Sequence, residues 1–197
     1  VNHTPPRRGC VLYQAAMRGH VELTRLLLAH PAAELECRHP DTGATPLIIA
    51  AMQDHVGCVV TLLDARADID AVDNDGATAL YIASHERREG AVRLLLERGA
   101  SVSKGSYYDE GIGGPLEAAA SQGHVAIVRT LLDACADART TIAGFRAVDF
   151  AREAGHEQVA RMLARDARLR AERVAADETG ESLGTAARAE LPEAVGA

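Results

Sequence analysis

Apolar residues return along the chain at helical spacing, in blocks separated by Gly and polar turn residues. The segment GHVELTRLLL at residues 19–28 recurs almost unchanged as GHVAIVRTLL at residues 123–132. In the second copy Val125, Val128, Leu131 and Leu132 follow an i, i+3, i+6, i+7 pattern, which places them on one face of an α-helix. The pattern therefore predicts amphipathic helices that recur along the chain.

Three further blocks share this pattern. The five are LYQAAMRGHVELTRLLL from Leu12, LIIAAMQDHVGCVVTLL from Leu47, LYIASHERREGAVRLLL from Leu80, LEAAASQGHVAIVRTLL from Leu116 and VDFAREAGHEQVARMLA from Val148. Their starts are 35, 33, 36 and 32 residues apart. A period of this length is the signature of a repeat architecture in which each unit is one supersecondary element.

Each unit has the signals of two helices. Thr45 and Pro46 indicate a helix start, because a hydroxyl caps a free backbone N–H and Pro at the first position has no N–H to leave unpaired. Gly19, Gly123 and Gly155 indicate the end of the first helix, since Gly readily adopts the left-handed conformation found there. The run 73–76, Asp-Asn-Asp-Gly, predicts a turn between units.

These features resemble the ankyrin repeat family, which has a period of 33 and the signature T-P-L-H-x-A. The best matches are DTGATPLIIAA at Asp41–Ala51 and LLLERGASVS at Leu94–Ser103. The resemblance implies an all-α fold, an ankyrin-repeat solenoid of stacked helix-turn-helix units joined by β-hairpin-like turns. A helix pair cannot bury its apolar face alone, so at least three units must stack.

The chain also departs from the family pattern. The signature His is replaced in every unit, and the residues that stand there are Tyr13, Ile48, Tyr81, Glu117 and Asp149. Cys10 and Gly114 stand where Thr begins the signature. Unit three has Arg87 and Arg88 in place of the Gly-His turn, which leaves its helix break undefined.

The predicted organisation is a short N-terminal flank at 1–8, a repeat domain at 9–166 and a tail at 167–197. The units fall at about 9–38, 39–71, 72–104, 105–139 and 140–166. The last unit has a polar outer face, as a terminal cap should have, made by Arg152, Glu157, Gln158, Arg161 and Arg165. The tail begins with a helical pattern and becomes charged and Gly-punctuated, so we expect disorder from about Asp177.

Composition and charge limit which classes of partner the chain can have. Apolar residues make up 47% of the chain and charged residues 25%, which is typical of a globular protein. The net charge of -7 argues against nucleic acid as a partner. No apolar run approaches the roughly 18 residues of a membrane span, so we expect no membrane insertion. We expect a monomer in an intracellular location, cytoplasmic or nuclear.

The four cysteines, Cys10, Cys37, Cys58 and Cys135, are scattered and form no C-x-x-C pair. This spacing indicates neither a zinc site nor a redox motif. In the absence of a secretory signal we expect buried thiols in a reducing compartment rather than disulfides.

Two groups of residues could carry chemistry but also fit structural roles. His20, His55, His124 and His156 occupy one position in four units, and regular imidazoles can hold a metal. Stacked units would hold them about 10 Å apart, too far for one metal ion, so a structural role is favoured. Cys58, three residues after His55, could form a nucleophilic pair, but it occupies the apolar position of Leu23 and Ile127. We expect no catalytic, metal or cofactor site.

What remains is a surface. In ankyrin proteins the partner usually lies on the concave side, formed by the hairpin tips and first helices. Carried over by position, this resemblance implies a partner-binding surface of Thr42, Ala44, Met52, Gln53, Val72, Asn74, Ala77, Tyr81, His85, Glu86, Ser121 and Gln122. Tyr107 and Tyr108 join them as a hypothesis, because the loop 103–116 has about three residues more than a standard turn. Adjacent aromatics on a Gly-rich loop are typical interface anchors, although tolerated drift explains the loop equally well.

The sequence therefore predicts a non-catalytic interaction module, an adaptor or scaffold that binds another protein. The alternative is a targeting or substrate-recruiting arm of a larger enzyme whose catalytic domain lies outside this chain, an interpretation that the initial Val1 in place of Met leaves open.

Overall fold

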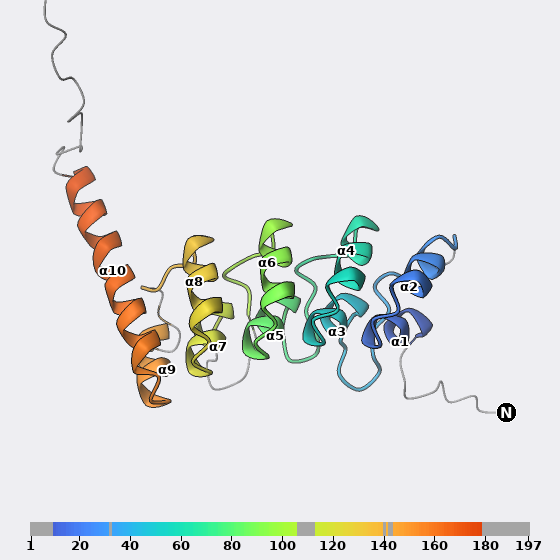
Figure 1. The fold of residues 1–197 in the computed structure, drawn as a ribbon, viewed down its shortest axis with the longest axis horizontal. Helices are drawn as coiled ribbons and strands as arrows, with labels where there is room; N and C mark the ends of the chain where they lie inside the picture. Colours follow the sequence, from blue (N-terminus) through green and yellow to red (C-terminus); the bar gives the residue numbers. More distant parts are fainter. Residues whose placement is uncertain (1–9, 32, 106–112, 140, 142–143, 179–197) are drawn as a thin grey trace, which may run out of the picture.

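A computed structural model of the chain describes residues 10–31, 33–105, 113–139, 141 and 144–178 (Figure 1). Within these ranges the chain forms ten helices and no strand. They are α1 (Val11–Met17), α2 (Val21–Leu28), α3 (Pro46–Met52), α4 (Val56–Asp64), α5 (Ala79–His85), α6 (Glu89–Glu97), α7 (Pro115–Ser121), α8 (Val125–Asp133), α9 (Ala147–Glu153) and α10 (Glu157–Glu178).

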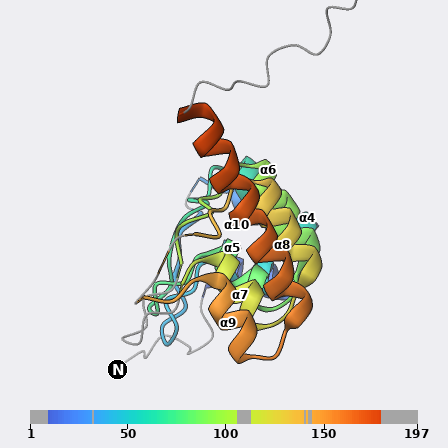
Figure 2. The same ribbon diagram turned by 90° about the vertical axis from the view of Figure 1, so that its left-hand side faces the viewer.

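The helices form two rows, as the period predicts. Odd-numbered helices make an inner row and even-numbered helices an outer row, so that the molecule is an elongated stack of five helix pairs (Figure 1). Viewed along the stack, the inner helices lie between the connecting loops and the outer helices (Figure 2). The all-α ankyrin-type solenoid expected from the sequence is thereby confirmed.

The first helix of each pair begins where the sequence predicts. The Thr45 hydroxyl accepts a hydrogen bond from the Ile48 N–H at 3.3 Å, and Thr78 accepts one from Tyr81 at 3.1 Å. In unit one the Cys10 sulfur takes the same role and accepts from the Tyr13 N–H at 3.3 Å. Each cap satisfies a donor that the first turn of a helix leaves unpaired.

Left-handed residues end the inner helices in every unit. Gly19 and Gly123 have φ of 71° and 72°, as their place in the pattern requires. Arg87 has φ of 60°, so unit three has the same break although it lacks the Gly. The helix end that the sequence left undefined is therefore present, held by the stack and not by the residue type.

The loops between units are tight turns. An isolated antiparallel bridge joins Val72 and Thr78, and the Asp73 carboxylate accepts from the N–H groups of Asp75 and Ala77 at 3.0 and 2.9 Å. This confirms the turn predicted at residues 73–76. The tip of one loop also touches the next, since the Asn74 N–H donates to the Thr42 carbonyl at 2.9 Å.

The core is continuous along the stack and rich in small residues. Alanines at one position of the inner helices, Ala50, Ala83, Ala119 and Ala151, are all 0% exposed. They let neighbouring helices approach closely, while Leu and Val of the outer helices fill the space between the rows. This packing explains how a chain almost without aromatics builds a core.

At the C-terminal end the outer helix is much longer than its counterparts. Helix α10 continues without a break through the boundary placed at residue 166 and reaches Glu178. Arg152, Glu157, Gln158, Arg161 and Arg165 are exposed, as a terminal cap requires. Of the segment in which disorder was expected, residues 179–197 lie outside the described residues, as does the flank at 1–8.

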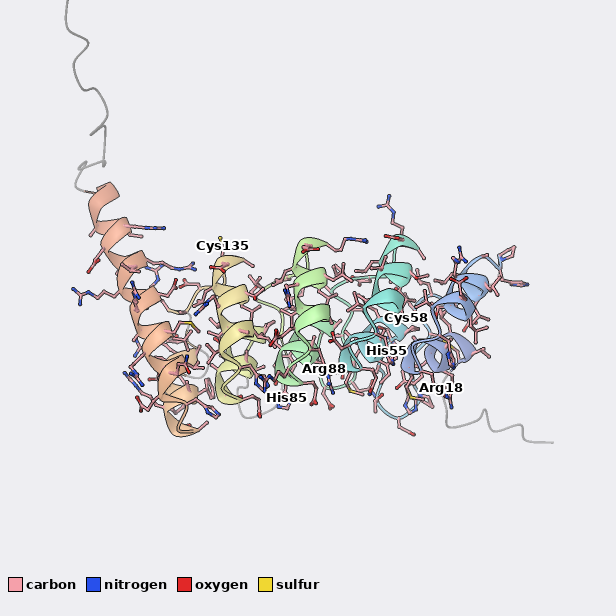
Figure 3. All side chains as sticks on the ribbon, in the orientation of Figure 1. Arg18, His55, Cys58, His85, Arg88 and Cys135 are labelled. Atoms are coloured by element: carbon pink, nitrogen blue, oxygen red, sulfur yellow. A yellow bond between two sulfur atoms is a disulfide. The ribbon has the colours of Figure 1, made fainter. Side chains whose placement is uncertain are left out.

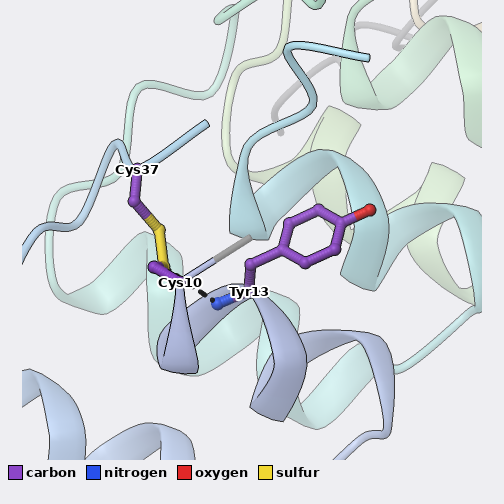
Figure 4. The surroundings of a disulfide bond; sticks show 3 residues. All are labelled: Cys10, Tyr13 and Cys37. Carbon is purple, nitrogen blue, oxygen red and sulfur yellow. Dashed lines mark hydrogen bonds between the residues drawn. A yellow bond between two sulfur atoms is a disulfide. The ribbon is translucent and has the colours of Figure 1, made fainter. Parts of the chain in front are cut away.

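The expectation for the cysteines is wrong for three of the four. Cys10 and Cys37, 27 residues apart, form a disulfide beside the start of α1 (Figure 4), and Cys135 is exposed. Only Cys58 is the buried thiol expected. The repeat explains the pairing. The loop after α2, which contains Cys37, runs back past the start of α1, where Cys10 is the N-cap.

Leu131→Ala should lower the free energy of unfolding by about 2–5 kcal/mol, because Leu131 is 0% exposed and its truncation leaves a cavity. Leu26→Ala serves as the matched control on another outer helix, since Leu26 is 70% exposed. Chemical denaturation of both variants gives the comparison. Equal losses in the two would contradict the packing described.

Cys37→Ser should lower stability by about 3.5 kcal/mol, the chain-entropy estimate for a closed loop of this length. Cys37 is the better choice because the Cys10 sulfur also caps α1. Denaturation with and without dithiothreitol is the measurement. Reductant should destabilise the wild type and Cys135→Ser but leave Cys37→Ser unchanged; a wild type indifferent to reductant would refute the disulfide.

Candidate partner-binding surface

Two of the four repeated histidines form hydrogen bonds between neighbouring units. The His55 Nε2 lies 3.2 Å from the Met17 carbonyl oxygen, and the His124 Nε2 lies 2.9 Å from that of His85. Figure 3 labels His55 and His85 among the side chains of the stack. A carbonyl oxygen can only accept, so in both rings the proton is on Nε2. Each hydrogen bond therefore joins the start of an outer helix to the end of the inner helix of the preceding unit.

Unit three shows which chemistry this position needs. There Arg88 replaces His, and its Nε donates to the Met52 carbonyl at 2.7 Å. A guanidinium stays protonated and is neither a base nor a usual metal ligand, yet it makes the same contact. The position requires a hydrogen-bond donor, which supports the structural role expected for the histidines.

Two glycines make room for the rings. A Cβ at Gly19 would lie 2.8 Å from the His55 Nδ1, and one at Gly123 would lie 2.6 Å from the His156 Nδ1. Both glycines also have positive φ. The glycine of one unit therefore leaves the space that the histidine ring of the next unit occupies, and this packing recurs along the stack.

Cys58 has the surroundings of a core residue. It is 0% exposed, its sulfur lies 3.7 Å from the Thr24 hydroxyl, and burial raises the pKa of its thiol. A nucleophilic Cys needs the opposite shift and a nearby base, whereas the His55 Nε2 is bound to Met17. Among the described residues no group of three or more His, Cys, Asp and Glu is arranged to hold a metal ion.

Glu117, which departs from the family pattern and to which the sequence assigned no role, is a buried carboxyl. It is 6% exposed, burial raises its pKa, and it accepts hydrogen bonds from the backbone N–H groups of Gly114 and of Glu117 itself. Gly114 is the N-cap of α7 and has no side chain to cap the helix. Glu117 therefore replaces the missing Thr, and the two departures from the family pattern compensate each other.

The expected surface follows the C-terminal ends of three inner helices. Gln53, Glu86 and Gln122 are exposed at equivalent positions of units two, three and four. Beside them Met52, His85 and Ser121 are half-buried. The row is linked across units, because the His85 ring lies 3.2 Å from the Gln122 amide nitrogen and 3.1 Å from the Glu86 carboxylate.

The tips of the loops between units form the second part of the expected surface. Thr42, Val72 and Asn74 are exposed, and the Asn74 side-chain amide donates to the Asp41 carbonyl at 3.2 Å. Arg38 fastens the base of these loops, since it donates to the Val72 carbonyl at 2.6 Å. The tips of units two and three are thus held by hydrogen bonds to each other.

Three residues of the expected surface are buried. Ala44, Ala77 and Tyr81 are 7%, 4% and 8% exposed, and Ala77 and Tyr81 pack with Ala118 of the next unit. Stacking covers them, so they can offer little area to a partner. Tyr107 and Tyr108 lie outside the described residues.

Comparison with known proteins agrees with the stack of repeated helix pairs. Residues 7–106, about half of the chain, match the family model for ankyrin repeats in three copies. The chain belongs to the ankyrin repeat family.

Similar proteins include neurogenic locus notch homolog protein 2 of Homo sapiens, 35% identical over 92 residues, 47% of this chain and 4% of that protein. Ankyrin repeat and KH domain-containing protein mask-1 of Caenorhabditis elegans is 34% identical over 129 residues, 64% of this chain and 5% of that protein. Ankyrin repeat and SOCS box protein 11 of Pongo abelii is 37% identical over 90 residues, 46% of this chain and 27% of that protein. The chain thus spans a small part of each relative.

Within the described part of the chain, every helix is either too short or too polar to cross a lipid bilayer. The Cys10–Cys37 disulfide does not fit the expectation of buried thiols in a reducing compartment, which was drawn from the absence of a secretory signal.

His124 should make stability fall below neutral pH. Burial lowers its pKa from the ordinary 6.5, while the His85 carbonyl raises it and Arg87, His85 and His156 lower it further. The unfolded chain therefore binds the proton more readily, so the stabilisation present above pH 6.5 is lost as pH falls through the folded pKa.

Urea denaturation of the wild type and of His124→Gln between pH 7.5 and 5 is the measurement. The variant keeps a donor but cannot titrate, so its loss of stability on acidification should be smaller. Parallel curves for the two proteins would show that His124 does not titrate in this way.

Proposed function

We propose that this chain is a non-catalytic protein-interaction module, an adaptor or scaffold whose concave face and loop tips bind another protein. The observation that carries the proposal is that different positions of the repeat have different roles. A position that the units share holds the stack together, as His55 and His124 show, whereas one position at which they differ forms the exposed row of Gln53, Glu86 and Gln122.

The rigidity of this row supports binding. The side chains of His85 and Gln122 are held together across two units. The two loop tips are joined by the Asn74 N–H, which donates to the Thr42 carbonyl, and by the Asn74 side-chain amide, which donates to the Asp41 carbonyl. A surface that is already ordered loses little conformational entropy when a partner docks. Ankyrin repeats are generally interaction modules, which supports the same conclusion at the level of the family.

The case against catalysis rests on the two candidate groups. The Cys58 thiol is buried with a raised pKa, and the histidines act as donors between units. Each group therefore has a structural role that its burial and bonding explain.

A targeting arm of a larger enzyme is the second candidate. The specific observation in its favour is length, since the chain covers only 4%, 5% and 27% of three relatives, whose names include other modules such as a KH domain and a SOCS box. Both candidates use the same surface and differ in what is attached to it.

A triple variant, Gln53→Ala, Glu86→Ala and Gln122→Ala, should bind the partner at least about tenfold more weakly, because it removes three exposed contacts from one row. Its thermal melting should match the wild type. The control is Arg66→Ala, Arg93→Ala and Arg129→Ala, three exposed residues that follow α4 or lie in α6 and α8 and do not belong to the row. Affinity capture followed by titration with the captured protein measures both.

Equal loss of binding in the two triple variants would contradict a concave site. If the captured protein is instead modified by a larger polypeptide that contains this chain, the targeting arm is the better description.

A further inference from the structure

The disulfide fixes the start of the loop between units one and two. Cys10 is the N-cap of α1, the position that Thr45 occupies at α3. Cys37 lies in the loop that leads from α2 to α3, at the position that Ala71 occupies in the next loop (Figure 4). A covalent bond therefore attaches the loop segment 36–38 to the start of a helix.

The residues on either side of the second cysteine hold the following loop in place. The Glu36 carboxylate accepts a hydrogen bond from the Asp68 N–H at 2.8 Å. Arg38 donates to the carbonyl oxygens of Gly43 and Val72, at 3.1 and 2.6 Å. Because the disulfide fixes the backbone between these two side chains, it also fixes where both sets of bonds are made.

The same two loops carry tips of the candidate surface. The Asn74 N–H donates to the Thr42 carbonyl at 2.9 Å, so the two tips touch. Arg38 holds both of them near their bases, one at Gly43 and the other at Val72. A continuous path of covalent and hydrogen bonds therefore leads from the disulfide to the exposed tips.

The next loop along the stack is held without a disulfide. There Asp70 accepts from the Ser101 N–H at 2.9 Å, the same kind of contact that Glu36 makes one loop earlier. Ala71 stands in place of Cys37, so no covalent bond can form. The disulfide thus adds a constraint that the fold of the repeat does not require.

Reduction by a dithiol removes this constraint. Cys37 is half-buried between the exposed Glu36 and Arg38, so it lies at the surface. A thiolate of the dithiol attacks the Cys37 sulfur, and Cys10 leaves as a thiolate that takes up a proton. The second thiol of the dithiol then displaces Cys37, so that the protein gains two thiols and the dithiol becomes a disulfide.

We propose that the Cys10–Cys37 disulfide is a redox control of the candidate surface. The oxidised chain holds the tips around Thr42 and Asn74 in one arrangement, and reduction by a dithiol releases them. This inference rests on the proposed function, because it concerns the same surface. Tips that are already ordered lose less conformational entropy when a partner docks, so the oxidised chain binds more tightly.

Amide hydrogen exchange of the full chain, measured by NMR before and after reduction with dithiothreitol, tests the control without a partner. A Cys135→Ser background removes the exposed free thiol. The N–H groups of Asp68 and Asn74 should exchange at least about tenfold faster after reduction, because the loop that holds their acceptors is released. The Ser101 N–H, bound to Asp70, is the matched control and should not change.

Two outcomes of this measurement overturn the proposal. Unchanged rates at Asp68 and Asn74 would show that the disulfide does not hold the tips. Equal acceleration at Ser101 would show that reduction loosens the whole stack and has no particular effect on the surface.

Titration with the protein captured by the oxidised chain tests the consequence for binding. Reduction should weaken binding about three- to tenfold, which corresponds to ordering about one additional side chain when the partner docks. Cys37→Ser should bind like the reduced chain and should not respond to dithiothreitol. Arg38→Ala keeps the disulfide but loses the bonds to Gly43 and Val72, so it should weaken binding in both states and reduce the difference between them.

Equal affinities of the oxidised and reduced chains would overturn the redox control even if exchange at the tips accelerates. A response of Cys37→Ser to dithiothreitol would overturn it as well, since the effect would then arise elsewhere. The triple variant of Gln53, Glu86 and Gln122 still decides the proposed function by itself, so the two failures are distinguishable.

Discussion

The contact between neighbouring helix pairs is the interaction on which the rest of this structure depends. A single pair buries one side of its helices, so the free energy of folding comes from the surface that the next pair covers. At the starts of the outer helices α4, α6 and α8 this contact includes a hydrogen bond from His55, Arg88 and His124 to a backbone carbonyl of the preceding unit.

Further bonds reinforce the stack at the same intervals. The Glu36 carboxylate accepts from the Asp68 N–H at 2.8 Å, and the Asp70 carboxylate accepts from the Ser101 N–H at 2.9 Å. Such bonds satisfy backbone groups that the loops would otherwise leave unpaired. They also fix the register between loops, and therefore fix the spacing of the exposed residues at the loop tips.

The sequence predicted the architecture well because stacking acts locally and repeats. The period, the cap at Thr45 and the turn at Asp73 each depend on a few neighbouring residues. The disulfide between Cys10 and Cys37 was missed because the pairing depends on where the loop after α2 returns, which residue spacing does not reveal.

The candidate surface was predicted less well, for a related reason. The family pattern indicates which positions vary but not how deeply each is covered in this chain. Tyr81 varies between units and yet packs under the next unit, whereas Gln53 varies and stays exposed. Glu117 could have been recognised, because a carboxyl three residues after Gly114 follows the spacing of a capping box.

The contact between units also decides which aliphatic side chains are buried. Cys58, Ile127 and Val159 occupy one position of the outer helices and are 0%, 1% and 1% exposed, because each faces the preceding unit. Leu23 occupies the same position in unit one and is 42% exposed, since no described unit covers it. Burial at this position therefore depends on the neighbouring unit and not on the residue type, which explains why periodicity alone does not predict how exposed a given residue is.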